Sequence, residues 1–180
     1  QLMDSIYGLY ESRILNHPAL DGEFAYYEQQ TLRYEKINHI FRFEDVKRYL
    51  NKDTAYKVSS QYPNPLEDLD VNNERLITIP SYLNVLGLYL DEMAKQSYDE
   101  SSDEFYAIRL DVLESEISNG AVKEAMLQHS GEFAIAQSKK KSALAARYLA
   151  LSTDEVYKQR ISDLAAKYEL ISEGKQSPNF

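Results

Sequence analysis

Few side chains in this sequence are of the types that carry out catalysis. Cysteine is absent, so thiolate nucleophiles, disulfides and cysteine-ligated zinc sites have no residue to form from. The three histidines, His17, His39 and His129, are far apart, and none has a second histidine at metal-ligand spacing. A nucleophile elbow and a glycine-rich phosphate loop are also missing. We therefore predict no catalytic, cofactor-binding or metal-binding residues and no cofactor.

Acidic side chains gather in two places, at Asp68 and Asp70 and again in residues 99–104. Carboxylate oxygens suit a hard cation such as calcium. Neither stretch has the twelve-residue EF-hand pattern with its central glycine, so we interpret both as solvated acidic loops. Glu114 and Glu116 do not form a catalytic pair, because residues two apart point in different directions on a helix.

Tyrosine is the most distinctive residue type, with fifteen Tyr against six Phe and no Trp. Tyrosine suits positions that are apolar at one end and wet at the other, either at a core edge or at a protein interface. The segment 62–79 is long, proline-stiffened and acidic, and it contains several leucines. We predict a possible partner surface near Tyr62, Leu66 and Tyr82. The alternative is that these residues seal one end of the core.

The net charge of −9 repels phosphate backbones, so we predict no nucleic-acid binding. The one basic run, Lys139-Lys140-Lys141, is typical of a solvated helix end. No apolar run approaches the length needed to span a bilayer. Peripheral membrane association is expected only through a lipid anchor elsewhere in the parent protein, if there is one.

Apolar residues recur at steps of three and four along most of the chain, which indicates amphipathic helices. Only six Gly and five Pro interrupt them. Helical spacing covers 2–15, 20–41, 80–93, 105–117, 144–151 and a last segment ending near 171, with shorter pieces within 43–61 and 122–127. The fold class predicted is all-α: an irregular bundle of about six to eight helices with one long central loop, residues 62–79.

Local signals mark several helix ends. Ser101 with Glu104, and Ser152 with Glu155, match the capping-box pattern at a helix start. Leu151 and Val156 stand at the positions of a hydrophobic staple. No sequence repeat with a fixed period of about 30–45 residues is evident, so a regular helical-repeat array is not predicted.

The residues Gly174, Lys175, Pro178 and Phe180 match the pattern Gly-Lys-x-x-Pro-x-Phe. This segment resembles the entry into a thioredoxin-like domain of the AhpC/TSA and TlpA-like thiol–disulfide oxidoreductases. The rest of the chain is similar to the helical regions that precede such domains in TlpA-like envelope proteins. Shared features are a Pro-x-Tyr helix start, here Pro80-Ser81-Tyr82, and a closing stretch from Lys167-Tyr168 to Gly174. Without cysteine, none of that family's redox residues can be carried over.

The resemblance implies a helical accessory domain over 1–171, with 172–180 as the linker and start of a thioredoxin-like domain that follows in the parent protein. The expected function is non-catalytic: positioning substrate proteins or assisting assembly of a cell-envelope oxidoreductase, periplasmic or lipoprotein, in a Gram-negative bacterium. Expected partners are that thioredoxin-like domain and possible substrate proteins. The alternative is a free-standing helical protein–protein interaction module. The chain itself is not expected to be an enzyme, although the parent protein is.

One consequence of the composition can be tested on the chain alone. Thiol–disulfide exchange requires attack by a thiolate, and this chain has no thiol. In an insulin-reduction assay with dithiothreitol, the pure chain should give the rate of the buffer. A rate above that background would contradict the prediction.

Overall fold

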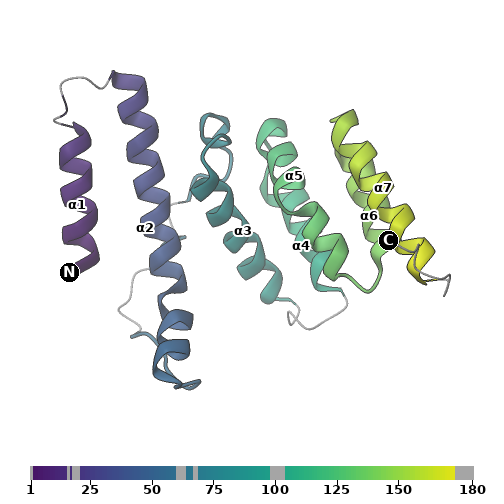
Figure 1. Cartoon of the computed structure of the whole chain (residues 1–180), viewed down its shortest axis with the longest axis horizontal. Coiled ribbons are helices and arrows are strands. Elements are labelled where there is room, and N and C mark those ends of the chain that lie inside the picture. Colours follow the sequence, from purple (N-terminus) through teal and green to yellow (C-terminus); the bar gives the residue numbers. More distant parts are fainter. Residues whose placement is uncertain are drawn as a thin grey trace, which may run out of the picture. The chain divides into compact units, whose positions relative to one another are not determined.

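The computed structural model describes residues 2–15, 17, 21–59, 64–66, 69–97 and 104–172. Within these residues the chain forms seven α-helices and one short 3-10 helix, and no strand (Figure 1). The predicted all-α class with six to eight helices is confirmed. Some residues named above lie outside the described part of the chain. They are Tyr62, Ser101 and residues 173–180, which include the segment that resembles a thioredoxin-like entry.

Within the range predicted as one helical domain, the chain divides into two compact units, residues 1–86 and 87–180. The division falls inside a single helix, α3 (Pro80–Lys95). Its first two turns belong to the core of the first unit, and its remainder belongs to the second. Each unit is therefore described separately.

The first unit is built on α1 (Leu2–Leu15) and the 30-residue helix α2 (Gly22–Asn51). Asp21 caps α2, because its Oδ1 accepts a hydrogen bond from the Phe24 amide at 2.7 Å. The sequence indicated separate short turns from residue 43, but α2 continues unbroken to Asn51. Arg48 pairs with Glu44 and Asp45 one turn earlier, which supports the helix where the apolar spacing is weak.

The long connection from α2 to α3 folds against α3 over its second half. It contains the 3-10 helix η1 (Glu74–Leu76), and both Leu76 and Ile79 are buried. The buried rings of Tyr34 on α2 and Tyr82 on α3 meet edge to face, with centroids 5.0 Å apart. The core of this unit is therefore small, and part of it comes from the loop.

The second unit contains two consecutive helical hairpins (Figure 1). The first consists of α4 (Phe105–Glu116) and α5 (Gly120–Gln137), the second of α6 (Lys141–Leu151) and α7 (Glu155–Ser172). Corresponding helices start 35 or 36 residues apart and end 35 residues apart. The two hairpins are thus structural repeats of the same length.

Burial follows the same period. A shift of 35 residues maps each of six buried positions of the first hairpin onto a buried position of the second; the pairs are Arg109 and Leu144, Leu110 and Ala145, Leu113 and Tyr148, Ile117 and Ser152, Val122 and Tyr157, Met126 and Ile161. Other buried positions of the first hairpin, such as Leu127 and Ala134, map onto exposed ones. No pair conserves its residue type, so the sequence itself shows no repeat, as expected; the partial repeat lies in helix length and burial.

The second helix of each hairpin is capped at its N-terminus in the same way. Asn119 accepts from the amides of Ala121 and Val122, and Asp154, 35 residues later, accepts from those of Val156 and Tyr157. The capping residue of α7 is therefore Asp154 rather than the predicted Ser152. The staple is also absent, because Val156 is exposed.

Ser152 instead belongs to a contact between the hairpins. Its hydroxyl donates to Glu124 Oε1 on α5 at 2.6 Å, and the Thr153 amide donates to Glu124 Oε2 at 2.7 Å. Burial alone would raise the pKa of the Glu124 carboxyl, but the hydrogen bonds from Ser152 and Thr153 outweigh it and lower the pKa. Glu124 thus holds the α6–α7 turn against α5 as a carboxylate.

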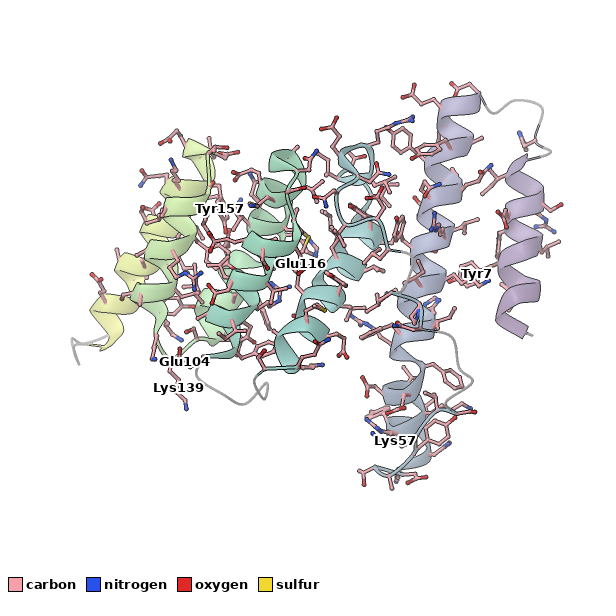
Figure 2. All side chains as sticks on the ribbon, turned by 180° about the vertical axis from the view of Figure 1, so that it is seen from behind. Tyr7, Lys57, Glu104, Glu116, Lys139 and Tyr157 are labelled. Carbon is pink, nitrogen blue, oxygen red and sulfur yellow. The ribbon has the colours of Figure 1, made fainter. Side chains whose placement is uncertain are left out.

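Gly131, in the middle of α5, allows two tyrosines of the second hairpin to approach closely. A Cβ atom there would lie 2.0 Å from the Tyr157 hydroxyl oxygen and 2.6 Å from Cε1 of Tyr148. Tyr157, labelled in Figure 2, donates from its hydroxyl to the Leu127 carbonyl oxygen at 2.6 Å. The two hairpins can therefore pack this closely only because residue 131 is a glycine, which has no Cβ atom.

We predict that Gly131→Ala destabilises the fold, although alanine is the better helix former. The added methyl group must displace two buried rings, which costs about 1–3 kcal/mol. Gly120→Ala in the same helix is the matched control, because nothing lies within 4 Å of its added Cβ. Urea unfolding monitored by circular dichroism measures both. A stabilising Gly131→Ala would contradict the described packing.

Candidate functional site

The second unit contains a buried charge. Arg109 on α4 is 7% exposed, and its Nε forms an ion pair with Asp91 of α3. Its Nη1 donates to the Ser130 hydroxyl at 3.0 Å, and its Nη2 lies 3.5 Å from the Gly87 carbonyl oxygen. A buried guanidinium requires such partners, because taking an unpaired charge out of water is costly.

Arg109 and its partners form the floor of a cavity of about 380 Å³. Its lining consists of Asp91, Phe105, Tyr106, Arg109, Ser130, Phe133 and Ala134. The rings of Tyr106 and Phe133 meet edge to face with centroids 6.4 Å apart, and Phe133 is 63% exposed. A large exposed aromatic ring beside a cavity is typical of a binding site rather than of a core. We call this cavity the Arg109 pocket.

Several polar atoms at the floor of the Arg109 pocket already have partners. The Ser130 hydroxyl accepts from Arg109 and donates to the Met126 carbonyl oxygen at 3.0 Å. Burial raises the pKa of the neighbouring Tyr148 phenol, although Arg109 acts in the opposite direction. Desolvation and the positive charge of Arg109 lower the pKa of His129. The floor is thus polar and neutral overall, and it suits an apolar or aromatic side chain better than a second charge.

The first unit has a second hollow, of about 390 Å³, between α1 and α2. Most of its lining is polar: Tyr7, Gly8, Glu11, Gln29, Gln30, Leu32, Arg33 and Lys36. Tyr7, labelled in Figure 2, shares a 2.6 Å hydrogen bond with Nδ1 of His39. Burial raises the pKa of the Tyr7 phenol, and the negative charge of Glu35 raises it further by a smaller amount. The phenol therefore stays protonated and joins the two helices.

The three residues of the predicted partner surface have different environments. Tyr62 lies outside the described residues, and Leu66 is half-buried in a turn. Tyr82 is fully buried; its hydroxyl donates to the Asp70 carbonyl oxygen at 3.0 Å and accepts from the Asn73 amide at 3.2 Å. For Tyr82 this geometry fits the alternative that it seals the core and holds the loop. A partner surface on the loop stays a prediction.

Sequence reasoning missed the Arg109 pocket. A signal was present, because Arg109 lies one turn from Phe105 and one turn from Leu113, both of which were predicted to be buried. An arginine in the middle of an apolar helix face must either pair with a carboxylate or extend its guanidinium into the solvent. The sequence does not show that Asp91, on another helix, is that carboxylate. His129 lies within the continuous helix α5.

No protein family, curated protein or solved structure matches the chain at a significant level. Among the described residues, no group of three or more His, Asp and Glu side chains is placed to hold a metal ion. The helices in the described part of the chain include none that is both long and apolar enough to cross a membrane. The assignment of function therefore depends on the geometry and on the resemblance of residues 174–180.

We predict that Arg109→Met lowers the free energy of unfolding by about 3 kcal/mol, because it leaves the Asp91 carboxylate without its partner. Arg160→Met is the control: Arg160 also pairs with a carboxylate, Glu132, but both are largely exposed, so the loss should stay below about 1 kcal/mol. Adding Asp91→Leu to Arg109→Met should recover part of the loss. Urea unfolding of the wild type and the three variants measures these differences in the free energy of unfolding. Equal effects of the two arginine variants would contradict a buried ion pair.

Proposed function

We propose that this chain is a non-catalytic helical accessory domain that binds substrate proteins for a cell-envelope thiol–disulfide oxidoreductase. The observation that carries the binding role is the Arg109 pocket. Its wall residue Phe133 is 63% exposed beside a cavity of about 380 Å³. Leaving a phenylalanine in water is unfavourable, and covering it with an apolar side chain of a partner recovers that free energy.

The chemistry of the pocket favours binding over catalysis. Arg109 is held by Asp91, Ser130 and Gly87, so its guanidinium is not available to polarise a substrate. The Ser130 hydroxyl donates to a main-chain carbonyl oxygen, and it has no base beside it to make it a nucleophile. A side chain that enters the pocket beside Tyr106 and Phe133 would meet aromatic walls above the Arg109 ion pair.

The proposed parent protein, a thiol–disulfide oxidoreductase, comes from a resemblance to the entry of a thioredoxin-like domain. The residues that carry it are Gly174, Lys175, Pro178 and Phe180. In this proposal the thioredoxin-like domain carries out exchange through a cysteine thiolate, and the helical domain holds the substrate protein near it. Its partners are that domain and the substrate proteins. The proposed location is the periplasm, or the envelope as a lipoprotein, of a Gram-negative bacterium.

A free-standing helical protein–protein interaction module remains the second candidate, and one observation favours it. The hairpins α4–α5 and α6–α7 repeat burial and capping with a period of 35 residues. Stacked helical hairpins of this length are the building units of solenoids, which bind other proteins along their surface. The two candidates share the pocket and differ in whether a redox domain is covalently attached.

The binding role can be tested in a protein that contains this chain and the thioredoxin-like domain. We expect Phe133→Ser to lower kcat/KM for a protein disulfide about tenfold, mainly through KM, because one aromatic contact is lost. Reduction of a small-molecule disulfide should be unchanged, since it needs no pocket. Val156→Ser is the matched control, because Val156 is also exposed, at 74%, but lies outside the pocket.

Two results would count against the proposal in different ways. Normal reduction of the protein disulfide by the Phe133→Ser variant would exclude the pocket as the substrate site. A reading frame that does not continue past residue 180 into a strand and a Cys-x-x-Cys motif would exclude the oxidoreductase setting. The interaction module would then remain.

A further inference from the structure

The C-terminal end of α2 exposes an apolar face. Val46, Tyr49 and Leu50 are 49%, 84% and 66% exposed. Their spacing of three and four residues places them on one side of the helix, and Arg42 lies on the same side, one turn before Val46. We refer to residues 42–57, which include this face and the segment after the helix, as the α2 tip.

The segment that follows the helix packs on the opposite side. Arg48 donates from Nε to the Tyr56 carbonyl oxygen at 2.9 Å, and the Val58 amide donates to Oε2 of Glu44 at 2.9 Å. Glu44 and Arg48 lie about half a turn around the helix from Val46 and Leu50. The chain therefore folds back onto the polar side of the α2 tip and leaves its apolar side uncovered.

The α2 tip is also the basic part of an acidic chain. It contains five Lys and Arg and three Asp and Glu residues, a net charge of +2, whereas the whole chain has −9. Arg48 pairs with Glu44 and Asp45. In the described part of the chain, no ion pair involves the other four cations: Arg42, Lys47, Lys52 and Lys57. Figure 2 labels Lys57 beside the end of α2.

We propose that the α2 tip docks on an anionic membrane surface, independently of the proposed substrate binding. Val46, Tyr49 and Leu50 enter the interface between headgroups and acyl chains, and three of the cations, Arg42, Lys47 and Lys52, bind lipid phosphates. Basic residues around a small apolar face are the composition of segments that lie in the membrane interface. Tyrosine is among the residues that prefer this depth.

The shape of the α2 tip favours a membrane over an acidic protein. Tyr49 is 84% exposed, and neither the Arg109 pocket nor the hollow between α1 and α2 is lined by residues of the tip. A protruding surface has no pocket in which a folded partner can place an anchoring side chain, but it can enter a soft lipid interface. At physiological ionic strength charges act over only about 8 Å, so the tip can be attracted although the chain as a whole is acidic.

Lys52 provides a sensitive probe of this role. It ends α2 with a positive φ of 52°, and its amide bonds back to the helix carbonyls. Glycine is the usual residue at such a position, because a side chain there is strained. Lys52→Gly should therefore relieve strain while it removes one charge from the tip. A weaker interaction with membranes in a protein of equal or higher stability would be attributable to the charge.

The test uses the whole chain with vesicles of phosphatidylcholine, either pure or mixed with phosphatidylglycerol. We expect co-sedimentation with the anionic vesicles that weakens as salt is added. Changing both Tyr49→Ser and Leu50→Ser should lower the partition coefficient about tenfold. Lys52→Gly with Arg42→Gln should lower it at least as much. Val156→Ser, which removes an exposed valine elsewhere, should have no effect.

The depth of insertion is tested separately, because the chain lacks cysteine and accepts a single label. An environment-sensitive dye on Val46→Cys, on the apolar side of the tip, should shift to the blue on anionic vesicles, and the same dye on Ser162→Cys should not. Absence of partitioning, partitioning unaffected by the Tyr49 and Leu50 changes, or no shift at residue 46 would each overturn the proposal. Binding to soluble polyglutamate without binding to vesicles would overturn it in favour of an acidic protein partner.

Discussion

The fold of each unit depends on one constraint: a phenol that is buried must keep its hydroxyl hydrogen-bonded. Tyr82 meets this requirement with the Asp70 carbonyl oxygen and the Asn73 amide, and in doing so fixes the loop before α3. Tyr157 meets it with the Leu127 carbonyl oxygen of α5. A phenylalanine at either position would pack equally well in several orientations, whereas the tyrosine specifies one. The tyrosine-rich composition is therefore mainly a structural device in these two places.

A related constraint applies to the arginine in the core of the second unit, whose charge must be paired. Its guanidinium pairs with Asp91 and donates to the Ser130 hydroxyl. Burial raises the pKa of the Tyr148 phenol, and the charge of the arginine acts in the opposite direction. In the second hairpin the position equivalent to Arg109 is Leu144. An apolar residue thus suffices at this position of the repeat. The polar network of the first hairpin therefore adds a feature that packing alone does not require, which supports a role for the pocket above it.

The sequence predicted the fold class because apolar spacing and helix punctuation are local properties. It did not predict the continuity of α2 through residues 43–51, where pairs formed by Arg48 replace apolar spacing as the support. The 35-residue period was hidden because Val122 and Tyr157, or Ile117 and Ser152, occupy equivalent buried positions with different chemistry. The Arg109 pocket required contacts between α3, α4 and α5, and such long-range contacts leave little trace in a single sequence. Only the observed burial of Tyr82 distinguishes a residue that seals the core from one that lies on a partner surface.

The α2 tip shows why a strained residue is informative when it lies beside an uncovered surface. A lysine with positive φ costs roughly 1 kcal/mol more than glycine would at the same position. Part of that cost is offset because a cation is favourable at the negative end of the α2 dipole. Glycine would avoid the strain but would also remove a charge from the most basic part of an acidic chain. In the proposed membrane docking, this lysine adds a charge next to Tyr49 and Leu50, in addition to the favourable cation that it places at the helix end.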